Sequence, residues 1–320
     1  MSERSASLPR SLFGQDSTAE EVTAGLDLTG KTALVTGCSA GIGYETMRVL
    51  VMRGALVYGV GRSMEKTQRA CGAVSASGAK GNALPFICEQ ADFSSVAACA
   101  DAVKKLGTPV DILICNAGVY SLPKLELAEG LEKQFVINHL SHFILVNRLL
   151  GLVQSAPRGR IVVVASAAAY VHAPEAGIEF DNLSGQRYYD AGKMYGQSKL
   201  ANVLFARELA HRLSGTRATA NSLDPGWVMT ETMREQWVRN HLDPEDAKVQ
   251  IGERWVSAKS PEQGAATTCY VATHPSLEGV SGEYFADNQM PIPPKNLRDD
   301  AMAKKLWAVS EEFTRPHLIQ

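Results

Sequence analysis

The sequence predicts an α/β protein built on a doubly wound parallel sheet. From Lys31 onward, short apolar runs alternate with longer amphipathic segments, which is the pattern of β-α-β units. The apolar runs lack strict polar alternation, as expected for strands covered by helices on both faces. Because no repeat or low-complexity linker divides the sequence, we predict a single domain over residues 28–320 and an N-terminal extension over residues 1–27.

The N-terminal extension is expected to contain a mobile tail and one short helix. Ser17 and Glu20 have the spacing of a capping box, which predicts a helix over about 18–25. The extension has no apolar stretch of the secretory kind, and its acidic residues Glu20 and Glu21 argue against a transit peptide.

Seven strands and six helices are predicted in the domain. The strand candidates are mostly rich in Val, Ile or Leu and span residues 32–36, 55–60, 84–89, 111–116, 160–166, 219–223 and 282–286. The helix candidates span about 42–53, 64–72, 94–106, 128–153 and 193–213, with a sixth beginning at Pro261. Between residues 227 and 260 the alternation stops, and a helical insertion containing Trp and Met is expected to cover the substrate.

Composition and charge exclude several classes of protein. The 320 residues are 45% hydrophobic and 21% charged, which is too apolar for an intrinsically disordered chain. With 32 basic and 34 acidic residues, no global positive field exists to attract nucleic acid or an anionic membrane. The richest apolar run, residues 161–169, is about half as long as a membrane span requires. The six cysteines form no C-x-x-C pair, so buried thiols and a cytoplasmic location are expected.

A glycine-rich turn follows the first strand. Gly37, Gly41 and Gly43 lie between this strand and the next helix. Without side chains there, the backbone can approach a pyrophosphate, and the helix N-terminus faces its negative charge. Turns also use glycine for backbone angles alone, but the position at the first β-α junction favours a dinucleotide site.

A second group of polar residues follows the fourth and fifth strands. Asn116 ends the fourth strand, Asn138 lies in the next helix, and Ser166 ends the fifth strand. Tyr195 precedes Lys199 by four residues, so both side chains share one helix face. A nearby cation lowers the pKa of a phenol from ~10 by ~1 to 3 units, so Lys199 is expected to make Tyr195 a usable proton carrier. The alternative is a chance pair in which the ring only packs beside a solvated lysine.

In this order, the motifs resemble the short-chain dehydrogenase/reductase family over residues 29–290. The matching segments are 36–43, 115–118, Asn138, Ser166, 195–199 and 225–230, and their spacing is similar to that of the single-domain branch. Segments 137–143, 178–185, 195–209 and 263–275 resemble the retinol dehydrogenase-like and chloroplast translocon-associated reductases. The resemblance implies a Rossmann-like fold and NADP(H)-dependent interconversion of a carbonyl and an alcohol without a metal.

The resemblance also implies roles for individual residues. Ser166 would hydrogen-bond the substrate oxygen, and Tyr195 would transfer the proton. Lys199 would bind the nicotinamide ribose, and Asn138 would hold a water that links Lys199 to solvent. The cofactor would be surrounded by Gly37, Ser39, Gly41, Ile42, Gly43, Arg62, Ser63, Asp92, Phe93, Asn116, Ala117, Gly118, Tyr195, Lys199, Pro225, Gly226, Val228 and Thr230.

Arg62 and Ser63 favour NADP(H) over NAD(H). They follow the second strand, where an NAD-selective enzyme would carry an acidic residue, and a guanidinium matches the shape of a 2'-phosphate. Arg62 could instead be a solvated loop charge. Asp92 would contact adenine, could cap the following helix, or could do both.

The substrate is expected to be a largely apolar small molecule. Trp227, Met229 and Met233 follow the turn that should border the nicotinamide, and such side chains could form a lid over an apolar ligand. They could instead only anchor the insertion to the core. The helices near 128–153 and 193–213 could also form a homodimer, as in other members of the family.

Three residues leave further alternatives open. Asp224 stands where a histidine often precedes the Pro-Gly turn, and it could alter substrate choice or simply cap a turn. His139 and His142 have the spacing of metal ligands, but no third ligand accompanies them, so packing and hydrogen bonding are expected.

Two other functions also remain open, namely a regulatory protein that senses NADP(H) and an enone reductase.

Overall fold

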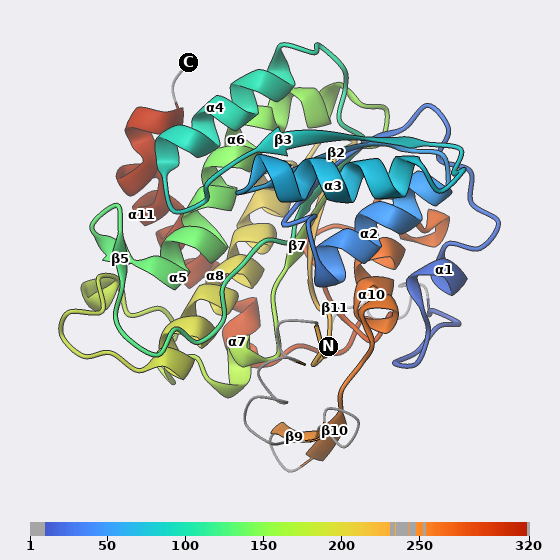
Figure 1. Ribbon diagram of the computed structural model, residues 1–320. Coiled ribbons are helices and arrows are strands. Elements are labelled where there is room, and N and C mark those ends of the chain that lie inside the picture. The colour runs from blue at the N-terminus through green and yellow to red at the C-terminus, as the bar shows by residue number, and fades with distance from the viewer. Residues whose placement is uncertain (1–9, 231–233, 235–242, 244–247, 252–253, 319–320) are drawn as a thin grey trace.

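A seven-stranded parallel sheet forms the centre of the protein (Figure 1). The computed structural model describes residues 10–230, 234, 243, 248–251 and 254–318. The strands are β1 (Thr32–Thr36), β2 (Leu56–Gly61), β3 (Asn82–Ile87), β4 (Ile112–Cys115), β7 (Arg160–Val164), β8 (Thr219–Asp224) and β11 (Tyr284–Ala286). Their order is β11-β8-β7-β4-β1-β2-β3, and all neighbours run parallel. The predicted strands are confirmed, each within two residues of its expected ends.

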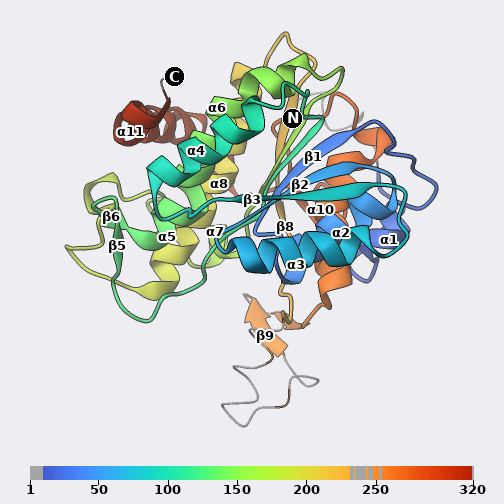
Figure 2. The same ribbon diagram turned by 45° about the horizontal axis from the view of Figure 1, so that its top comes forward.

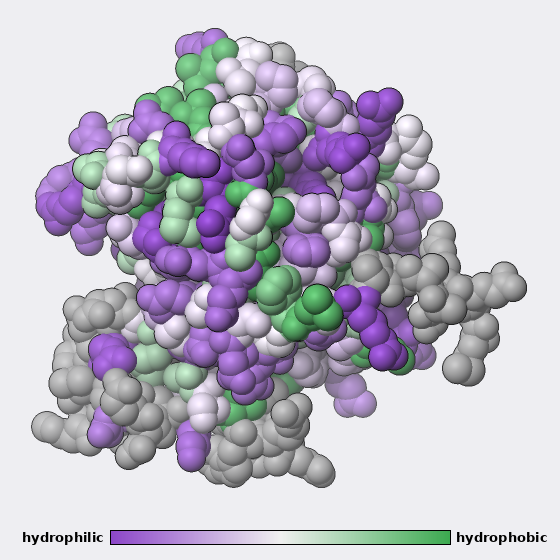
Figure 3. Space-filling model, turned by 90° about the vertical axis from the view of Figure 1, so that its right-hand side faces the viewer, coloured by the Kyte–Doolittle hydropathy of each residue, from purple (hydrophilic) through white to green (hydrophobic). Residues whose placement is uncertain are grey.

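Helices cover both faces of the sheet, which confirms the doubly wound α/β fold (Figures 1 and 2). One layer contains α1 (Ala19–Val22), α2 (Gly41–Met52), α3 (Met64–Ser75) and α10 (Pro261–Thr273). The other contains α4 (Phe93–Lys104), α6 (Ser141–Ser155), α8 (Ala191–Arg212) and α11 (Asp300–Leu318). Successive side chains of a strand point to opposite faces, so Leu34 and Val35 of β1 belong to two different apolar clusters. On the side of the molecule drawn in Figure 3, hydrophilic residues cover most of the surface.

Shorter elements connect these layers. They are α7 (Ala168–Val171) and the 3-10 turns Phe180–Asn182, Pro275–Leu277 and Lys295–Arg298. All six cysteines are buried and free, as the sequence predicted.

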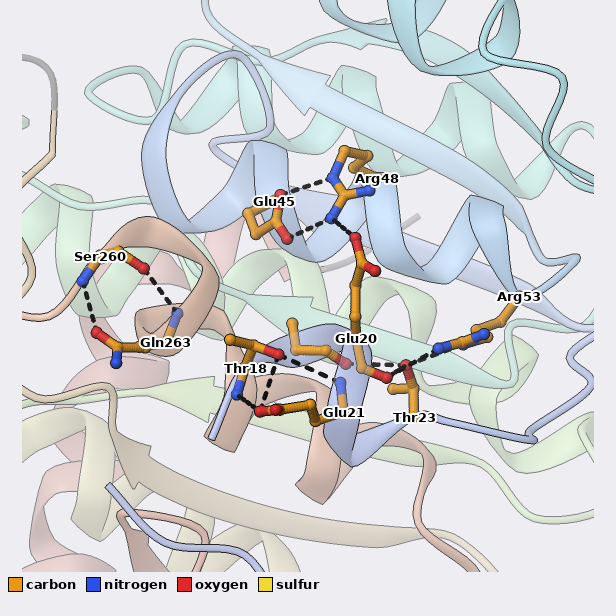
Figure 4. A network of polar contacts seen from close by, with 10 residues as sticks. Thr18, Glu20, Glu21, Thr23, Glu45, Arg48, Arg53, Ser260 and Gln263 are labelled. Carbon is orange, nitrogen blue, oxygen red and sulfur yellow. Dashed lines mark hydrogen bonds and ion pairs between the residues drawn. The ribbon is translucent and has the colours of Figure 1, made fainter. Parts of the chain in front are cut away.

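The short N-terminal helix is present, but its cap lies one residue later than predicted. Thr18, and not Ser17, is the N-cap, and it exchanges hydrogen bonds with Glu21 in a complete capping box. The chain offers this spacing twice in succession, so the pattern alone could not fix the register. Figure 4 shows how α1 is held: Arg48 of α2 donates to Glu20 and to Glu45.

Phe13 and Gly14, in the segment before α1, contact the domain. The Phe13 ring packs edge-on against Tyr270 of α10, with 5.9 Å between ring centroids. Asn288 Nδ2 donates to the carbonyl of Gly14 at 2.8 Å, and Gln289 Nε2 donates to the carbonyl of Phe13. This part of the predicted tail therefore contacts both α10 and the turn that follows β11.

The predicted helix over 128–153 is wrong at its start. A small antiparallel pair, β5 (Leu127–Ala128) and β6 (Leu131–Glu132), turns at Glu129 and Gly130, which both have positive φ. Because a helix cannot pass through two such residues, the helical stretch begins only at α5 (Lys133–Phe135). A π-helical turn, Val136–Leu140, then joins α5 to α6.

The continuous helical stretch Lys133–Ser155 is long and apolar enough to cross a membrane by length and composition. However, 72% of its apolar window is buried inside the protein, as in the core helix of a globular domain.

The insertion over 227–260 is not all helical. Its described part contains an antiparallel pair, β9 (Lys248–Ile251) and β10 (Arg254–Ser257), which lies apart from the main sheet in Figure 1. β-Branched and aromatic residues in these two segments favour strands, which explains why the helix prediction fails there. Met233 and Trp237 lie outside the described residues, as does the side chain of Trp255.

The C-terminal helix α11 was not predicted from the sequence. It lies across α6 and α8, where the Trp307 indole stacks on Phe205 and meets Phe143 edge-on, with ring centroids 5.7 and 4.8 Å away. Arg212 places its guanidinium 4.1 Å from the centre of the Trp307 ring. The helices expected to form a homodimer are therefore covered on this face by the chain's own C-terminus.

Candidate active site

The glycine-rich turn connects β1 to α2. Gly37 and Gly41 have φ of +69° and +58°, a region that side chains disfavour. A Cβ on Gly43 would lie 2.2 Å from the carbonyl oxygen of Gly37, so a larger residue cannot fit. The N-cap residue of α2, Ala40, offers no side-chain hydrogen bond to the first turn. The helix N-terminus therefore keeps N–H groups that could receive a phosphate, with Ser39 exposed beside it.

The loop after β4 is bonded directly to this turn. Thr36 Oγ1 accepts from the backbone N–H groups of Asn116 and Ala117 at 2.9 and 3.0 Å. Asn116 Nδ2 donates to the Thr36 carbonyl at 2.8 Å. A Cβ on Gly37 would lie 2.9 Å from Cα of Ala117, so the two loops touch through backbone.

His142 holds the contact between the glycine-rich turn and the loop after β4 through hydrogen bonds. Its Nδ1 bonds the Asn138 carbonyl at 3.0 Å, and its Nε2 lies 2.9 Å from both Thr36 Oγ1 and Gln90 Nε2. Because a carbonyl can only accept, Nδ1 carries the proton and Nε2 accepts. Burial lowers the pKa of His142 to about 4, so the ring is neutral at pH 7. His139 Nε2 contacts Ser310 Oγ at 2.8 Å, so both histidines have the predicted hydrogen bonds.

Asn138 lies in the π-helical turn. Its Oδ1 accepts from the Val119 N–H at 2.8 Å, and its Nδ2 donates to the Val119 carbonyl and to Ser198 Oγ. Ser198 Oγ in turn donates to the Tyr195 carbonyl at 2.7 Å. A Cβ on Gly118 would lie 3.0 Å from Asn138 Oδ1 and 3.6 Å from Lys199 Nζ. Asn138 therefore joins the loop after β4 to the helix that carries Tyr195 and Lys199.

Ser166, Tyr195 and Lys199 meet beside the carboxyl end of β7. Lys199 Nζ donates to the Val164 carbonyl at 3.1 Å and lies 5.7 Å from the centre of the Tyr195 ring. The Ser166 side chain lies beside the Tyr195 hydroxyl and acts to lower its pKa.

The pKa of Tyr195 is nevertheless raised, and the predicted lowering by Lys199 is wrong for this structure. Burial is the main cause, and the Asp224 carboxylate adds to it. Lys199 faces the ring and bonds a carbonyl, and burial lowers its own pKa to about 8. The cation therefore does not offset the cost of burying a phenolate.

The segment 225–230 passes over the glycine-rich turn. Val228 pairs with Lys259 in a parallel bridge, and Thr230 Cγ2 lies 3.1 Å from where a Cβ on Gly41 would be. Val228 and Ile42 both lie within 3.3 Å of a Cβ placed on Gly264. Pro225 is buried and Gly226, with φ of +83°, lies on the Lys259 side chain. The structure thus brings this segment to the glycines, as predicted.

Four predicted cofactor residues lie at the ends of β2 and β3. Arg62 is exposed, and Ser63 caps α3 by accepting from Lys66 N at 3.4 Å. Asp92 caps α4 by accepting from the N–H groups of Ser94 and Ser95. Phe93 does not face the site, because its ring packs in the core against His317 and its N–H bonds Glu129.

One aromatic residue at the site was missed in the sequence. Tyr120 is 66% exposed and meets the Tyr195 ring edge-on, with centroids 4.7 Å apart. Its only sequence signal is its place two residues after the 115–118 motif. Of the predicted substrate residues, Met229 is buried, Trp227 is partly buried, and Met233 lies outside the described residues.

In the described part of the chain, no three His, Cys, Asp or Glu side chains lie close enough together to hold a metal ion.

Comparison with known proteins agrees with this geometry. Residues 31–178 match the family model described as short chain dehydrogenase. Retinol dehydrogenase 14 of Homo sapiens is 37% identical over 296 residues, covering 88% of this chain and 85% of the relative. The chain belongs to the short-chain dehydrogenase family. The chloroplastic short-chain dehydrogenase TIC 32 B of Brassica napus is 38% identical and covers 94% of both chains. This family of oxidoreductases thus includes relatives of both kinds that the motifs resembled.

Solved structures of other proteins share the fold. An uncharacterized protein from Mycobacterium Paratuberculosis is 28% identical, with a TM-score of 0.72 over 92% of this chain and 97% of that one. The Pseudomonas aeruginosa RhlG/NADP active-site complex is 25% identical, with a TM-score of 0.62 over 82% and 96%.

Proposed function

We propose that this short-chain dehydrogenase interconverts a carbonyl and an alcohol on a largely apolar small molecule, using NADP(H). The observation that carries the proposal is the meeting of Ser166, Tyr195 and Lys199 beside the glycine-rich turn. A protein that only senses a nucleotide needs no buried proton carrier beside the turn.

The chain's own residues fit a dinucleotide. The two bridging phosphates would lie at the uncapped N-terminus of α2, beside the glycines at 37, 41 and 43. The 2'-phosphate would meet the exposed Arg62. The hydroxyl of Ser63 accepts from Lys66 N and keeps its own proton to donate. The NADP named in the RhlG complex supports the same cofactor.

The proton steps follow from the side chains. When bound, the nicotinamide supplies or receives the hydride. Tyr195 donates its hydroxyl proton to the carbonyl oxygen during reduction and takes it back during oxidation. Ser166, beside the Tyr195 hydroxyl, donates its one hydroxyl proton to the same oxygen and holds it in place. Lys199, whose Nζ bonds the Val164 carbonyl, would hold the nicotinamide ribose. Asn138, with Ser198, fixes the helix that carries Tyr195 and Lys199.

An apolar substrate is supported by the side chains beside Tyr195. Tyr120 presents an exposed ring there, and Trp227 and Met229 follow the Pro225–Gly226 turn that would border the nicotinamide. Such groups favour a ring or hydrocarbon over a small polar carbonyl. The name of the retinol dehydrogenase relative agrees with this substrate class.

The test is turnover of the Tyr195→Phe variant with NADPH across a panel of apolar and small polar aldehydes and ketones. The variant keeps the ring and loses one hydroxyl, so kcat should fall by about 10² to 10⁴ while NADPH still binds. Tyr188→Phe is the matched control, because Tyr188 is a surface tyrosine whose hydroxyl bonds Glu179, and it should keep wild-type turnover.

Three results would contradict the proposal. Wild-type turnover by Tyr195→Phe would exclude Tyr195 as the proton carrier. Tight binding of NADPH without turnover of any substrate would favour a sensing protein. Reduction of the carbon–carbon double bond of an enone, with its carbonyl intact, would favour the enone reductase.

A further inference from the structure

A buried carboxylate stands at the carboxyl edge of the sheet behind the proposed catalytic residues. Asp224 ends β8 and is 9% exposed. Its Oδ1 accepts from the Gly226 N–H at 3.0 Å, and the Ala167 N–H, next to Ser166, helps to lower the pKa of the carboxyl. The side chain therefore lies between the loop after Ser166 and the turn at Gly226.

The register of the sheet brings this carboxylate toward the catalytic group. Val164 pairs with Leu223, so Asp224 lies beside the residues that lead to Ser166. Lys199 Nζ donates to the carbonyl of the same Val164 at 3.1 Å. Burial raises the pKa of Tyr195 and lowers that of Lys199, and the Asp224 charge favours the protonated form of both groups.

Charged and titratable groups from several elements lie near Asp224. Lys259, just before α10, is 7% exposed and forms an ion pair with Asp287 after β11, with 2.5 Å between Nζ and Oδ1. Lys259 attracts the Asp224 carboxylate and Asp287 repels it. Burial, Asp224 and Tyr170 of α7 all raise the pKa of Tyr284 of β11, and Tyr120 meets the Tyr195 ring. Burial raises the pKa of Asp224 itself, and its two backbone donors and Lys259 oppose that rise.

We propose that Asp224 is a positioning residue whose negative charge keeps the protons on Tyr195 and Lys199 up to a higher pH than they would otherwise hold them. The proposal rests on the proposed function and adds that Asp224 sets the pH range in which the reaction proceeds. A carboxylate repels the phenolate and attracts the ammonium, so it favours the protonated form of both groups. The two groups titrate as a coupled pair, and removing Asp224 lowers both proton affinities. The site would therefore lose its proton donor at a lower pH.

The first experiment measures kcat/KM against pH with saturating NADPH for reduction and saturating NADP⁺ for oxidation. In Asp224→Asn the midpoint should fall by about one pH unit in both directions, which is about a tenfold change in proton affinity. At pH values below both midpoints, the reductive rate should change little. A role limited to bonding the two loops would lower rates at every pH and leave the midpoint where it is.

Asp287→Asn is the matched control. It removes a carboxylate from the same cluster, keeps a residue that tolerates the positive φ of 51° at this position, and acts on Lys259 instead of Tyr195. Its midpoint should stay at the wild-type value. Asp224→Ser, which is small and neutral and still accepts a hydrogen bond, should shift the midpoint in the same way as Asp224→Asn.

A second experiment needs no turnover. Tyrosine labelled with ¹³C at Cζ gives one NMR signal per ring, and the Tyr195 signal is the one absent from Tyr195→Phe. In protein saturated with NADP⁺, this signal should begin to titrate at a lower pH in Asp224→Asn than in wild type. If the Tyr195 titrations of folded Asp224→Asn and Asp224→Ser both coincide with that of wild type, or if Asp287→Asn shifts it as much, the proposal is wrong. A wild-type protein without any turnover would instead contradict the proposed function, and the NMR titration would still decide the role of Asp224.

Discussion

Arg62 shows how a single residue links a motif to a choice of cofactor. It stands at the carboxyl end of β2, exposed, immediately before the Ser63 cap of α3. The neighbouring Gly61 is the position where an acidic residue would be introduced to favour NAD(H). A Cβ there would lie 2.3 Å from Thr67 Oγ1, so such a substitution would disturb α3 as well as the cofactor. Arg62 is therefore the better position for a test.

Arg62→Glu should reduce kcat/KM with NADPH by about 10- to 100-fold, because one charge-assisted hydrogen bond to a phosphate is worth about 1.5 to 3 kcal/mol. The value with NADH should change little or rise. Steady-state kinetics with both cofactors measures the ratio. Arg158→Glu is the control, since Arg158 pairs with Glu278 near the start of β7, at the opposite edge of the sheet. Equal losses with both cofactors would argue against a contact with the 2'-phosphate.

The two buried histidines predict a dependence of stability on pH. Burial lowers the pKa of His142 to about 4 and that of His139 to about 3, whereas an unfolded histidine titrates near 6.5. Below pH 6.5 the unfolded chain binds protons that the folded chain does not, so the free energy of unfolding falls as the pH drops toward 4. Each histidine contributes a slope of up to about 1.4 kcal/mol per pH unit.

Urea denaturation at pH values from 7 to 4.5 measures this slope. His142→Gln should remove one histidine's share of it, and His211→Gln, at a side chain that is 54% exposed, is the control for a general effect of replacing a histidine. An unchanged slope in His142→Gln would show that His142 is not held neutral in the fold.

Residue-level prediction from the sequence succeeded where the signal is local. The spacing of Tyr195 and Lys199 placed both on one helix, and the structure brings Ser166 and Asn138 to them. It failed for groups that only the fold brings together. Tyr120 packs on a tyrosine 75 positions later, and Lys259 reaches Asp287 from another element. The shifted pKa of Tyr195 could not be predicted either, because burial depends on every element around the site.

At the scale of elements, helix boundaries were predicted well where capping residues or glycines mark them. Asp92 before α4 and Ser260 before α10 are both observed N-caps. The apolar pattern near residue 128 was misleading, because Gly130 and Glu129 form a turn inside it. α11 was missed because it follows the last strand, beyond the region that the family motifs cover.

α11 should contribute strongly to stability through Trp307. The indole is 4% exposed and contacts Phe143, Phe205 and Arg212. Trp307→Ala should lower the free energy of unfolding by about 3 to 5 kcal/mol, as for other buried aromatic residues. Phe313→Ala, on the same helix and 41% exposed, is the control and should cost much less. Chemical denaturation of both variants makes the comparison, and equal losses would mean that the Trp307 contacts are not specific.

At the scale of the whole molecule, the order of the strands explains where the site forms. β1 lies between β4 and β2, so the chain reverses direction across the sheet beside the glycine-rich turn. The loops after β1, β4, β7 and β8 therefore meet at one carboxyl edge, where open α/β sheets bind their ligands. This topology could be predicted from alternation and motif order. The β9 and β10 pair could not, because no motif of the family fixes the insertion.

The bridge between Val228 and Lys259 has a consequence for how substrate range could change. Backbone hydrogen bonds join Met229 N to the Lys259 carbonyl and Lys259 N to the Trp227 carbonyl, at 2.9 and 2.8 Å. The two ends of the insertion therefore leave the domain side by side, and exchanging the chain between them does not require the sheet to move. A recombination event, or a designed chimera, could replace this stretch as a cassette. The hydride and proton chemistry would stay in the inherited scaffold while the molecules admitted to it change.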